Sequence, residues 1–283
     1  MNHQKKSVAF IEIIRELVEN RKLIRMLSRN DFKAKFAGSF FGILWAFVQP
    51  IVTVLVYWFV FDKAINVGGQ VTKAGLTAPY VVWLVAGMVP WFYFSEVVNL
   101  GSNTLIEYDY LVKKVVFKIS TLPIVKIISS LFVHIFFIGF MVVLYILYGY
   151  APTAYTLQVI YYSLAMIILC IGIIYATSAI SVFFRDLTQI ISIFMQVLMW
   201  MTPIMWNMQG MVDQGRISKP IEILLKMNPM YYIVSGYRDA MLNNTWFWER
   251  GSMNLYFWAV TIVLFILGTT IFKKLQPHFA DVL

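Results

Sequence analysis

The sequence has few charged residues and almost no cysteine. Of its 283 residues, 13% are charged and 60% are hydrophobic, and the mean hydropathy is +0.73. A soluble domain of this length needs more polar surface, because charged side chains almost always stay in water. The single cysteine, Cys170, lies in an apolar run, which excludes a disulfide framework and a thiolate metal site. The composition therefore indicates a membrane protein.

Motifs for nucleotide binding and metal catalysis are missing as well. The sequence contains no Gly-x-x-x-x-Gly-Lys-Ser/Thr loop for phosphate and no His-Glu-x-x-His motif for zinc. The three histidines, His3, His134 and His278, are isolated from one another in the sequence. We therefore predict that this chain is not an enzyme and has no catalytic residue, no metal site and no cofactor of its own.

Six stretches are long and apolar enough to cross about 30 Å of hydrocarbon as helices. They lie near residues 38–61, 79–101, 121–148, 156–182, 188–206 and 252–272. Of the 23 Lys and Arg residues, 15 fall in the segments on the side of the N-terminus and 7 in those on the opposite side. The positive-inside rule therefore predicts that both termini are cytoplasmic. Topology explains the net charge of +9, so we predict no nucleic-acid partner.

The predicted fold is an all-α polytopic membrane protein with two parts, a cytoplasmic interface segment at 1–37 and a transmembrane domain at 38–283. Residues 8–27 carry an apolar stripe at helical spacing, with charged residues on the other faces. This pattern predicts an amphipathic helix in the inner interface, either alone or in contact with a cytoplasmic partner.

The loop between the second and third spans, 102–120, has the charge order of a short helix. Acidic residues come early and lysines come late, which suits the helix dipole. Such a helix could be a rigid contact for a partner, and it could equally be a solvated connector whose lysines set the topology. In the outer segment, Pro220 and Pro229 each begin a short apolar run, which predicts two short helices in or on the outer leaflet.

Ionisable residues within the spans are rare. Glu96 is the clearest. An intramembrane carboxylate indicates a functional group by default, but Glu96 could instead pair with Lys126 or lie near the headgroups. Lys126 itself is expected to snorkel to the inner interface. Gly38 and Gly42 have the spacing of a small-xxx-small pair, so we expect them on one helical face that packs against another span.

Polar and aromatic residues in the spans are candidates for a passage. Gln49 precedes Pro50 near mid-membrane, where its amide prefers a polar partner or a wet pathway, and the proline permits a kink. Aromatic rings stack on sugar rings without demanding one stereochemistry. Most aromatics near the span ends fit an ordinary interfacial belt. Others could face an inner passage, namely Tyr57, Phe59 and Trp200.

Six segments together resemble one family. They are DFKAKFAGSFFGILWAFVQP at 31–50, TLIEYDYLVKKVVFK at 104–118, FFRDL at 183–187, TPIMW at 202–206, NPMYYIVSGYRDAML at 228–242 and KKLQPHFADVL at 273–283. In this order they are similar to the membrane subunit of type-2 ABC exporters of cell-surface polysaccharides, which carry O-antigen, capsule and teichoic acid polymers. The resemblance covers nearly the whole chain.

The resemblance implies a homodimer in a bacterial inner or plasma membrane, with two copies of a separate ATPase subunit that binds ATP and Mg. The cargo would be a glycan linked to undecaprenyl diphosphate or a similar lipid, moved from the cytoplasmic to the outer side. A coupling helix from about Leu105 to Phe117 would dock on the ATPase. Its contact residues would be Glu107, Tyr108, Asp109, Tyr110, Lys113 and Lys114.

The same resemblance places candidate residues along the route of the cargo. Basic residues near the inner entrance could attract the diphosphate, although topology explains them equally well; they are Arg29, Lys33 and Lys35. A re-entrant helix pair around 220–242 would lie at the outer mouth and adds Tyr231 and Tyr232 to the pathway and gate candidates Gln49, Tyr57, Phe59 and Trp200.

Other functions stay open on the sequence. A type-2 exporter of drugs or small lipids has the same architecture, although such exporters often carry a large outer domain or a fused ATPase. A polytopic glycosyl- or acyltransferase would need a cluster of catalytic acids or histidines. A structural or assembly protein would not regulate an ATPase.

Overall fold

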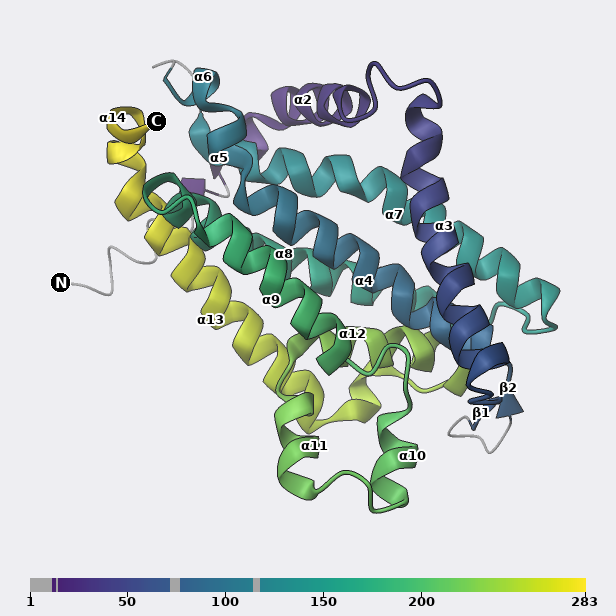
Figure 1. The fold of residues 1–283 in the computed structure, drawn as a ribbon. Coiled ribbons are helices and arrows are strands. Elements are labelled where there is room, and N and C mark those ends of the chain that lie inside the picture. The colour runs from purple at the N-terminus through teal and green to yellow at the C-terminus, as the bar shows by residue number, and fades with distance from the viewer. Residues whose placement is uncertain (1–11, 14, 72–76, 114–117) are drawn as a thin grey trace.

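The chain folds into a bundle of long helices with short helices at both ends (Figure 1). The computed structural model describes residues 12–13, 15–71, 77–113 and 118–283. Within these residues five helical stretches are long and apolar enough to cross a membrane, which confirms five of the six predicted spans. They are Gly42–Ala64, Tyr80–Ser102, Ile119–Leu147, Ala154–Phe183 and Ser252–Val282.

The main elements follow one another through the chain, and apart from one small antiparallel hairpin they are helical. They are α2 (Arg21–Ala34), α3 (Trp45–Trp58), β1 (Gln70–Val71), β2 (Thr77–Ala78), α4 (Tyr80–Ser102), α5 (Thr104–Glu107), α6 (Asp109–Val112), α7 (Leu122–Leu147), α8 (Gln158–Phe183), α9 (Leu187–Met201), α10 (Met208–Asp213), α11 (Lys219–Lys226), α12 (Pro229–Arg238), α13 (Ser252–Leu275) and α14 (Phe279–Val282).

The sixth predicted span, 188–206, is a shorter helix followed by non-helical chain. The helix α9 has 15 residues, which at a rise of 1.5 Å per residue is about 22 Å. It ends at Thr202, whose backbone is extended with φ −82° and ψ 126°. The helix α9 alone is therefore shorter than the hydrocarbon layer of about 30 Å. To cross the membrane, the chain would also need the non-helical segment that follows it.

The helix α4 lies at the centre of the bundle. Its most apolar stretch is 78% buried, whereas that of the span containing α3 is 11% buried. It packs against α7, α8 and α12. A helix that is apolar on all sides suits this position because every face meets another helix. The exposed apolar side chains of α3, by contrast, suit contact with lipid or with a second protein chain.

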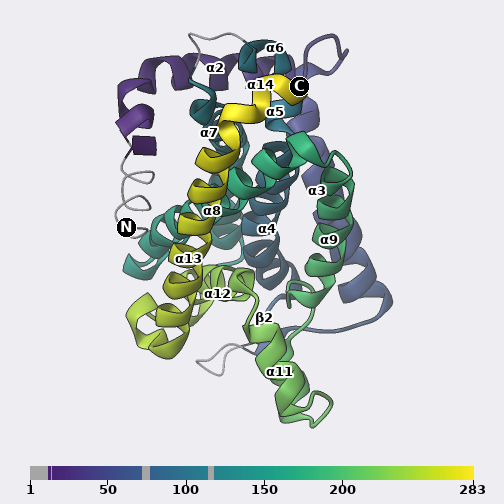
Figure 2. The ribbon, with the colours of Figure 1, turned by 90° about the vertical axis from the view of Figure 1, so that its left-hand side faces the viewer.

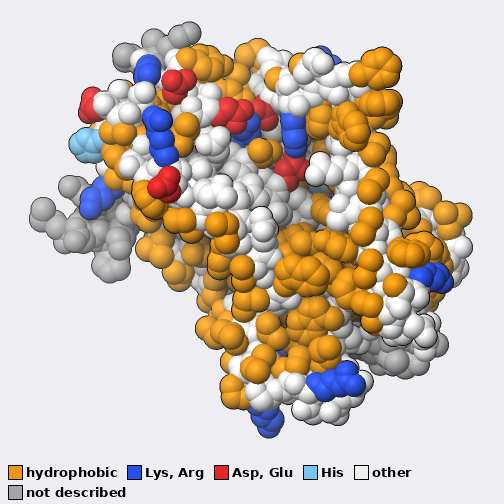
Figure 3. Space-filling view, viewed as in Figure 1, with side chains coloured by type: hydrophobic (Ala, Val, Ile, Leu, Met, Phe, Trp, Pro, Cys, Tyr) orange, Lys and Arg blue, Asp and Glu red, His pale blue; other side chains and the backbone are white. Residues whose placement is uncertain are grey.

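Charged and polar elements lie at the two ends of the bundle. The helices α2, α5, α6 and α14 lie at one end, and the hairpin with α10 and α11 lies at the other (Figures 1 and 2). Figure 3 shows acidic and basic side chains gathered at the α2 end, with mainly hydrophobic surface between the ends on that face. This arrangement agrees with the segments that charge counting assigned to opposite sides of the membrane.

The helix α2 lies across the end of the bundle and packs on α7 (Figure 2). It is preceded by helical residues at 12–13 and 15–19 and a turn at Asn20. The prediction of one amphipathic helix over 8–27 is therefore wrong at Asn20, where a turn divides it, although the described residues on both sides are helical; residues 8–11 and 14 lie outside the described part. The helix also continues to Ala34, beyond the predicted end.

Gly38 and Gly42 do not share a helical face, so that prediction is wrong. Their φ angles are +80° and +51°, and they lie in the turn between α2 and α3. A Cβ at either position would meet no described atom within 4 Å. Left-handed backbone costs other residues about 1–2 kcal/mol. Glycine at these two positions therefore allows the chain to turn from the interface helix into the first span.

Close helix packing instead involves Gly172 on α8 and Gly268 on α13. A Cβ added at Gly268 would collide with the carbonyl oxygen of Gly172, and one at Gly172 would lie 2.7 Å from the backbone nitrogen of Phe265. Small residues let helix backbones approach closely in membranes, where van der Waals contact drives association. These two glycines therefore bring α13 onto the core.

We predict that Gly268→Ala lowers the thermal unfolding midpoint of the purified protein in detergent, because backbone must move to admit the methyl group. Overpacking of this kind costs about 1–3 kcal/mol. The matched control is Gly139→Ala on α7, where an added Cβ meets no described atom within 4 Å. Equal midpoints for the two variants would contradict the packing role.

Candidate functional site

A buried cluster of charges joins three elements at the α2 end. Lys126 on α7 is 5% exposed, and its Nζ lies 2.6 Å from Asp31 Oδ1 and 2.8 Å from Glu107 Oε1. Asp31 belongs to α2 and is 8% exposed, while Glu107 ends α5. The expectation that Lys126 snorkels to the interface is therefore wrong, because its charge is neutralised inside the protein.

Tyr108 completes this cluster, which we call the Lys126 junction (Asp31, Glu107, Tyr108 and Lys126). The Tyr108 hydroxyl donates a hydrogen bond to Asp31, and the Lys126 ammonium lies 5.1 Å from the centre of the Tyr108 ring. Burial, followed by this hydrogen bond, raises the pKa of Tyr108 above its usual range, so the hydroxyl stays a donor. By contrast, the Tyr110 side chain is 55% exposed.

The loop that carries Glu107 and Tyr108 is less regular than predicted. The described residues form two four-residue helices, α5 and α6, with a break at Tyr108. A single helix from Leu105 is therefore wrong for this part, and 114–117, with the predicted contact Lys114, lies outside the described residues. Asp109 and Lys113 form an exposed ion pair at 3.6 Å. The segment is thus anchored inward at Glu107, Tyr108 and the buried Val112, while Tyr110 and Lys113 are exposed.

A second ion pair links the end of α2 to α4. Lys35 Nζ lies 2.5 Å from Glu96 Oε1, and the Ser130 hydroxyl on α7 donates to the same oxygen at 3.1 Å. Glu96 therefore pairs with Lys35 and not with Lys126. Of the three basic residues predicted at the inner entrance, Arg29 and Lys33 are exposed on α2, while Lys35 already has a carboxylate partner.

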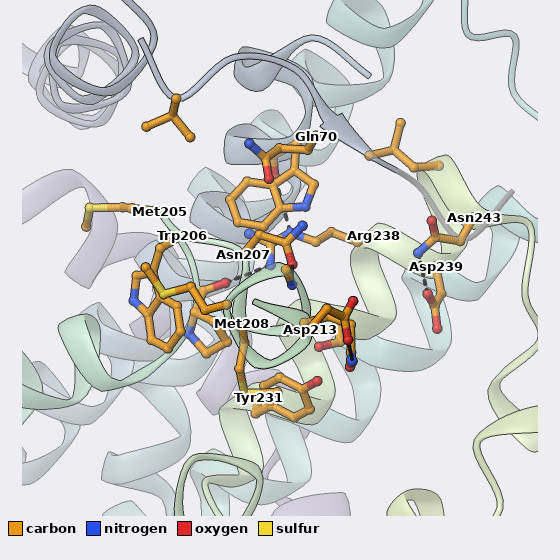
Figure 4. Close-up of a pocket in the computed structure, with 18 of the residues that line it drawn as sticks. Gln70, Met205, Trp206, Asn207, Met208, Asp213, Tyr231, Arg238, Asp239 and Asn243 are labelled. Carbon is orange, nitrogen blue, oxygen red and sulfur yellow. Dashed lines mark hydrogen bonds between the residues drawn. The ribbon is translucent and has the colours of Figure 1, made fainter. Parts of the chain in front are cut away.

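A cavity of about 1280 Å³ opens at the opposite end of the bundle (Figure 4). Its walls come from the chain around the hairpin, the segment after α9, and the helices α10 and α12. The lining mixes aromatic, amide and charged side chains, among them Gln70, Trp83, Trp206, Asn207, Asp213, Tyr231 and Arg238. Such a mixture suits a hydroxyl-rich ligand better than a purely apolar one.

Arg238 holds the inner wall of this cavity together. The side chain is 7% exposed, and its guanidinium donates to the carbonyl oxygens of Pro203 and Ile204, each at 2.7 Å, and of Trp83 at 3.3 Å. Its Cζ also lies 3.3 Å from the centre of the Trp83 ring. The planar, five-donor guanidinium can satisfy several carbonyls at once. Arg238 thereby ties the non-helical segment after α9 to α4 and α12.

Comparison with known proteins identifies the family. The sequence matches the ABC-2 type transporter family over residues 22–242. The chain belongs to the ABC-2 type transporter family. It is 27% identical over 271 residues to the O-antigen export system permease protein RfbA of Myxococcus xanthus, covering 96% of this chain and 99% of that protein. It is 26% identical over 262 residues to an O-antigen export system permease protein RfbA of Klebsiella pneumoniae, covering 92% and 95%.

In this ABC-2 type transporter the predicted pathway residues do not gather at one place. Gln49 and Phe59 are exposed on the first span, and Tyr57 is partly buried there. Trp200 lines a shallow apolar hollow of about 750 Å³ between α9 and α11. The two candidate tyrosines on α12, Tyr231 and Tyr232, point to different surroundings.

Tyr231 lines the large cavity beside the hairpin, whereas Tyr232 is 2% exposed and stacks on Phe257 with ring centres 4.6 Å apart. The Tyr232 hydroxyl donates to Asn254 on α13 at 3.0 Å. Tyr232 therefore packs within the transporter's core, away from the cavity that its neighbour lines.

Asp31 and Arg238 were absent from the residues that the sequence singled out. Asp31 is the single acidic residue in the α2 sequence, which is a usable signal for an internal ion pair. Arg238 stands among apolar and aromatic residues, but its carbonyl partners are 34 or more positions away. Over the described stretches of this transporter, no three His, Cys, Asp or Glu side chains gather as metal ligands would.

We predict that Arg238→Gln lowers the free energy of unfolding by about 3 kcal/mol, since a charged donor to several buried carbonyls is lost. Thermal unfolding in detergent measures this, with Arg216→Gln as the control, because Arg216 also lines the cavity but is exposed. Equal losses in the two variants would show that Arg238 does not hold the cavity wall.

Proposed function

We propose that the chain is the membrane subunit of an ATP-driven exporter that moves a lipid-linked polysaccharide, of the O-antigen kind, from the cytoplasmic to the outer side of a bacterial membrane. The observation that carries this is the end-to-end similarity to O-antigen export permeases, with more than nine tenths of both chains covered. A shared membrane domain alone would leave the cargo undetermined.

The α2 end suits a contact with a separate ATPase subunit. The segment α5–α6 projects from the bundle beside α2 (Figure 1), and Tyr110 and Lys113 are exposed on it. ATP and Mg bind to that partner subunit, and two copies of each subunit form the exporter. The pathway runs between the two membrane chains, along the exposed faces of α3 and α9, and both termini are cytoplasmic.

Both ends of the bundle suit a lipid-linked glycan. Arg29 and Lys33 are exposed on α2, where they can pair with a diphosphate headgroup. At the outer end, Trp206, Asn207 and Tyr231 line the cavity and offer stacking and hydrogen bonding to sugar rings. The helices α11 and α12, which begin beside Pro220 and Pro229 as predicted, form the re-entrant pair around this outer mouth.

We predict that Tyr110→Ala with Lys113→Ala reduces the amount of ATPase recovered with the affinity-purified chain by about tenfold. The reason is that aromatic side chains often supply much of the binding energy at an interface. Membrane insertion should stay at the wild-type level, because both side chains are exposed. Tyr108→Phe is the control, since its hydroxyl points inward to Asp31. Wild-type recovery of the ATPase with the double variant would contradict docking at this segment.

Reconstitution tests the function itself. Vesicles holding the chain and its ATPase should transfer lipid-linked glycan, extracted from the source membranes, across the bilayer in the presence of ATP and Mg. The chain alone should hydrolyse no ATP. ATP hydrolysis by the chain alone would contradict the proposal, as would equal transfer with and without ATP.

A further inference from the structure

The Lys126 junction connects the helix that bears the entrance residues to the segment that faces the ATPase. We propose that this junction makes α2, α5–α6 and the inner end of α7 one moving body, so that ATP-driven movement of the coupling segment is delivered to the entrance helix. This inference rests on the proposed function, because it assigns Asp31, Lys126 and Tyr108 as positioning residues for transport.

The chemistry of the junction opposes separation of its elements. One ammonium group serves carboxylates from two elements, Asp31 on α2 and Glu107 on α5. Parting α2 from α7 would leave the buried Asp31 carboxylate without its opposite charge, and parting α5 from α7 would remove the other carboxylate from Lys126, so both movements are unfavourable. The Tyr108 hydroxyl adds a direct bond between the coupling segment and α2. Sliding of one element past the others is therefore disfavoured.

Movement at the junction can reach the entrance residues because Asp31 and two of these residues belong to the same helix, α2. Asp31 lies in the last turn of α2, and Arg29 and Lys33 flank it on exposed positions. Lys35 follows directly and is bound to Glu96 on the central helix α4. A displacement of Asp31 therefore shifts the basic residues and pulls on the contact with α4.

The other fixed point of this region lies further back in the chain. Glu16 accepts a hydrogen bond from Ser120 and pairs with Lys273 at 3.2 Å on α13. This contact ties the start of the interface segment to the spans without involving α5 or α6. The two contacts thus have separate tasks, with Glu16 acting as an anchor and the Lys126 junction acting as the connection to the ATPase side.

Distances between spin labels test whether the body moves as one. In a Cys170→Ser chain, labels at Arg25 on α2 and Asn103 before α5 report the distance within the body. Labels at Arg25 and Gln189 on α9 report its position in the bundle; all three sites are exposed. Labelled chain is diluted with unlabelled chain in the complex with the ATPase, so that distances within one chain are read.

The proposal expects the Arg25–Asn103 distance to be the same in the nucleotide-free and ATP-bound complex, while the Arg25–Gln189 distance changes. A change in the first distance would overturn it, because α2 and the coupling segment would then move separately. A constant second distance would overturn it as well, because no movement would reach α2.

Variants test whether the junction matters for transport. Tyr108→Phe removes one hydroxyl, and Lys126→Met removes the shared charge. The matched control is Tyr148→Phe at the far end of α7, where the side chain is 45% exposed. We expect ATPase recovery at the wild-type level and broadening of the Arg25–Asn103 distances. Glycan transferred per ATP hydrolysed should fall by about tenfold, as for loss of a hydrogen bond to a charged group. Lys126→Arg should restore part of the loss.

The outcomes separate this inference from the proposed function. If Lys126→Met reduces folding because two carboxylates are left without their partner, Tyr108→Phe decides the matter. Wild-type transfer per ATP and wild-type distances in Tyr108→Phe would overturn the inference alone. Failure of the unmodified complex to transfer glycan would overturn the proposed function.

Discussion

A buried ammonium group requires carboxylates within reach, and this requirement organises the α2 end of the protein. Lys126 lies near the start of a membrane-spanning helix, and its two carboxylate partners come from an interface helix and from a loop. Because the cost of an unpaired charge is high inside a protein, the ion pairs oppose separation of these three elements. They thereby hold α2 and α5 against α7 at this end of the bundle.

At the opposite end of the bundle, buried backbone carbonyls need hydrogen-bond donors. The chain leaves helical geometry after α9, which frees carbonyl groups at the buried residues Pro203 and Ile204. Arg238 satisfies both and reaches Trp83 as well. Non-helical backbone in a membrane protein is tolerated where protein groups satisfy it or where it lines a cavity. Arg238 satisfies this segment, which also lines the cavity. An ABC-2 type transporter can thus keep an irregular, cavity-lining segment within a helical bundle.

Features governed by hydropathy and by local chemistry could be predicted from the sequence. Five spans follow from length and apolarity, and α11 and α12 follow from their prolines, with Asn228 capping α12. Pairing between distant residues could not be predicted, because Glu96 had two lysines to choose from and spacing does not decide between them. The small-xxx-small spacing does not separate the two cases either. Gly172 and Ala176 have this spacing and meet Gly268 in the contact between α8 and α13, whereas Gly38 and Gly42 have it and form a turn.

The side of the membrane on which lipid-linked glycan accumulates tests the central claim most directly. Cells depleted of this chain, with glycan synthesis intact, should hold the lipid-linked polymer on the cytoplasmic face, where it is inaccessible to glycan-degrading enzyme added to intact spheroplasts. Re-expression should return it to the accessible face. An accessible polymer at the wild-type level in depleted cells would show that this transporter does not carry the glycan across.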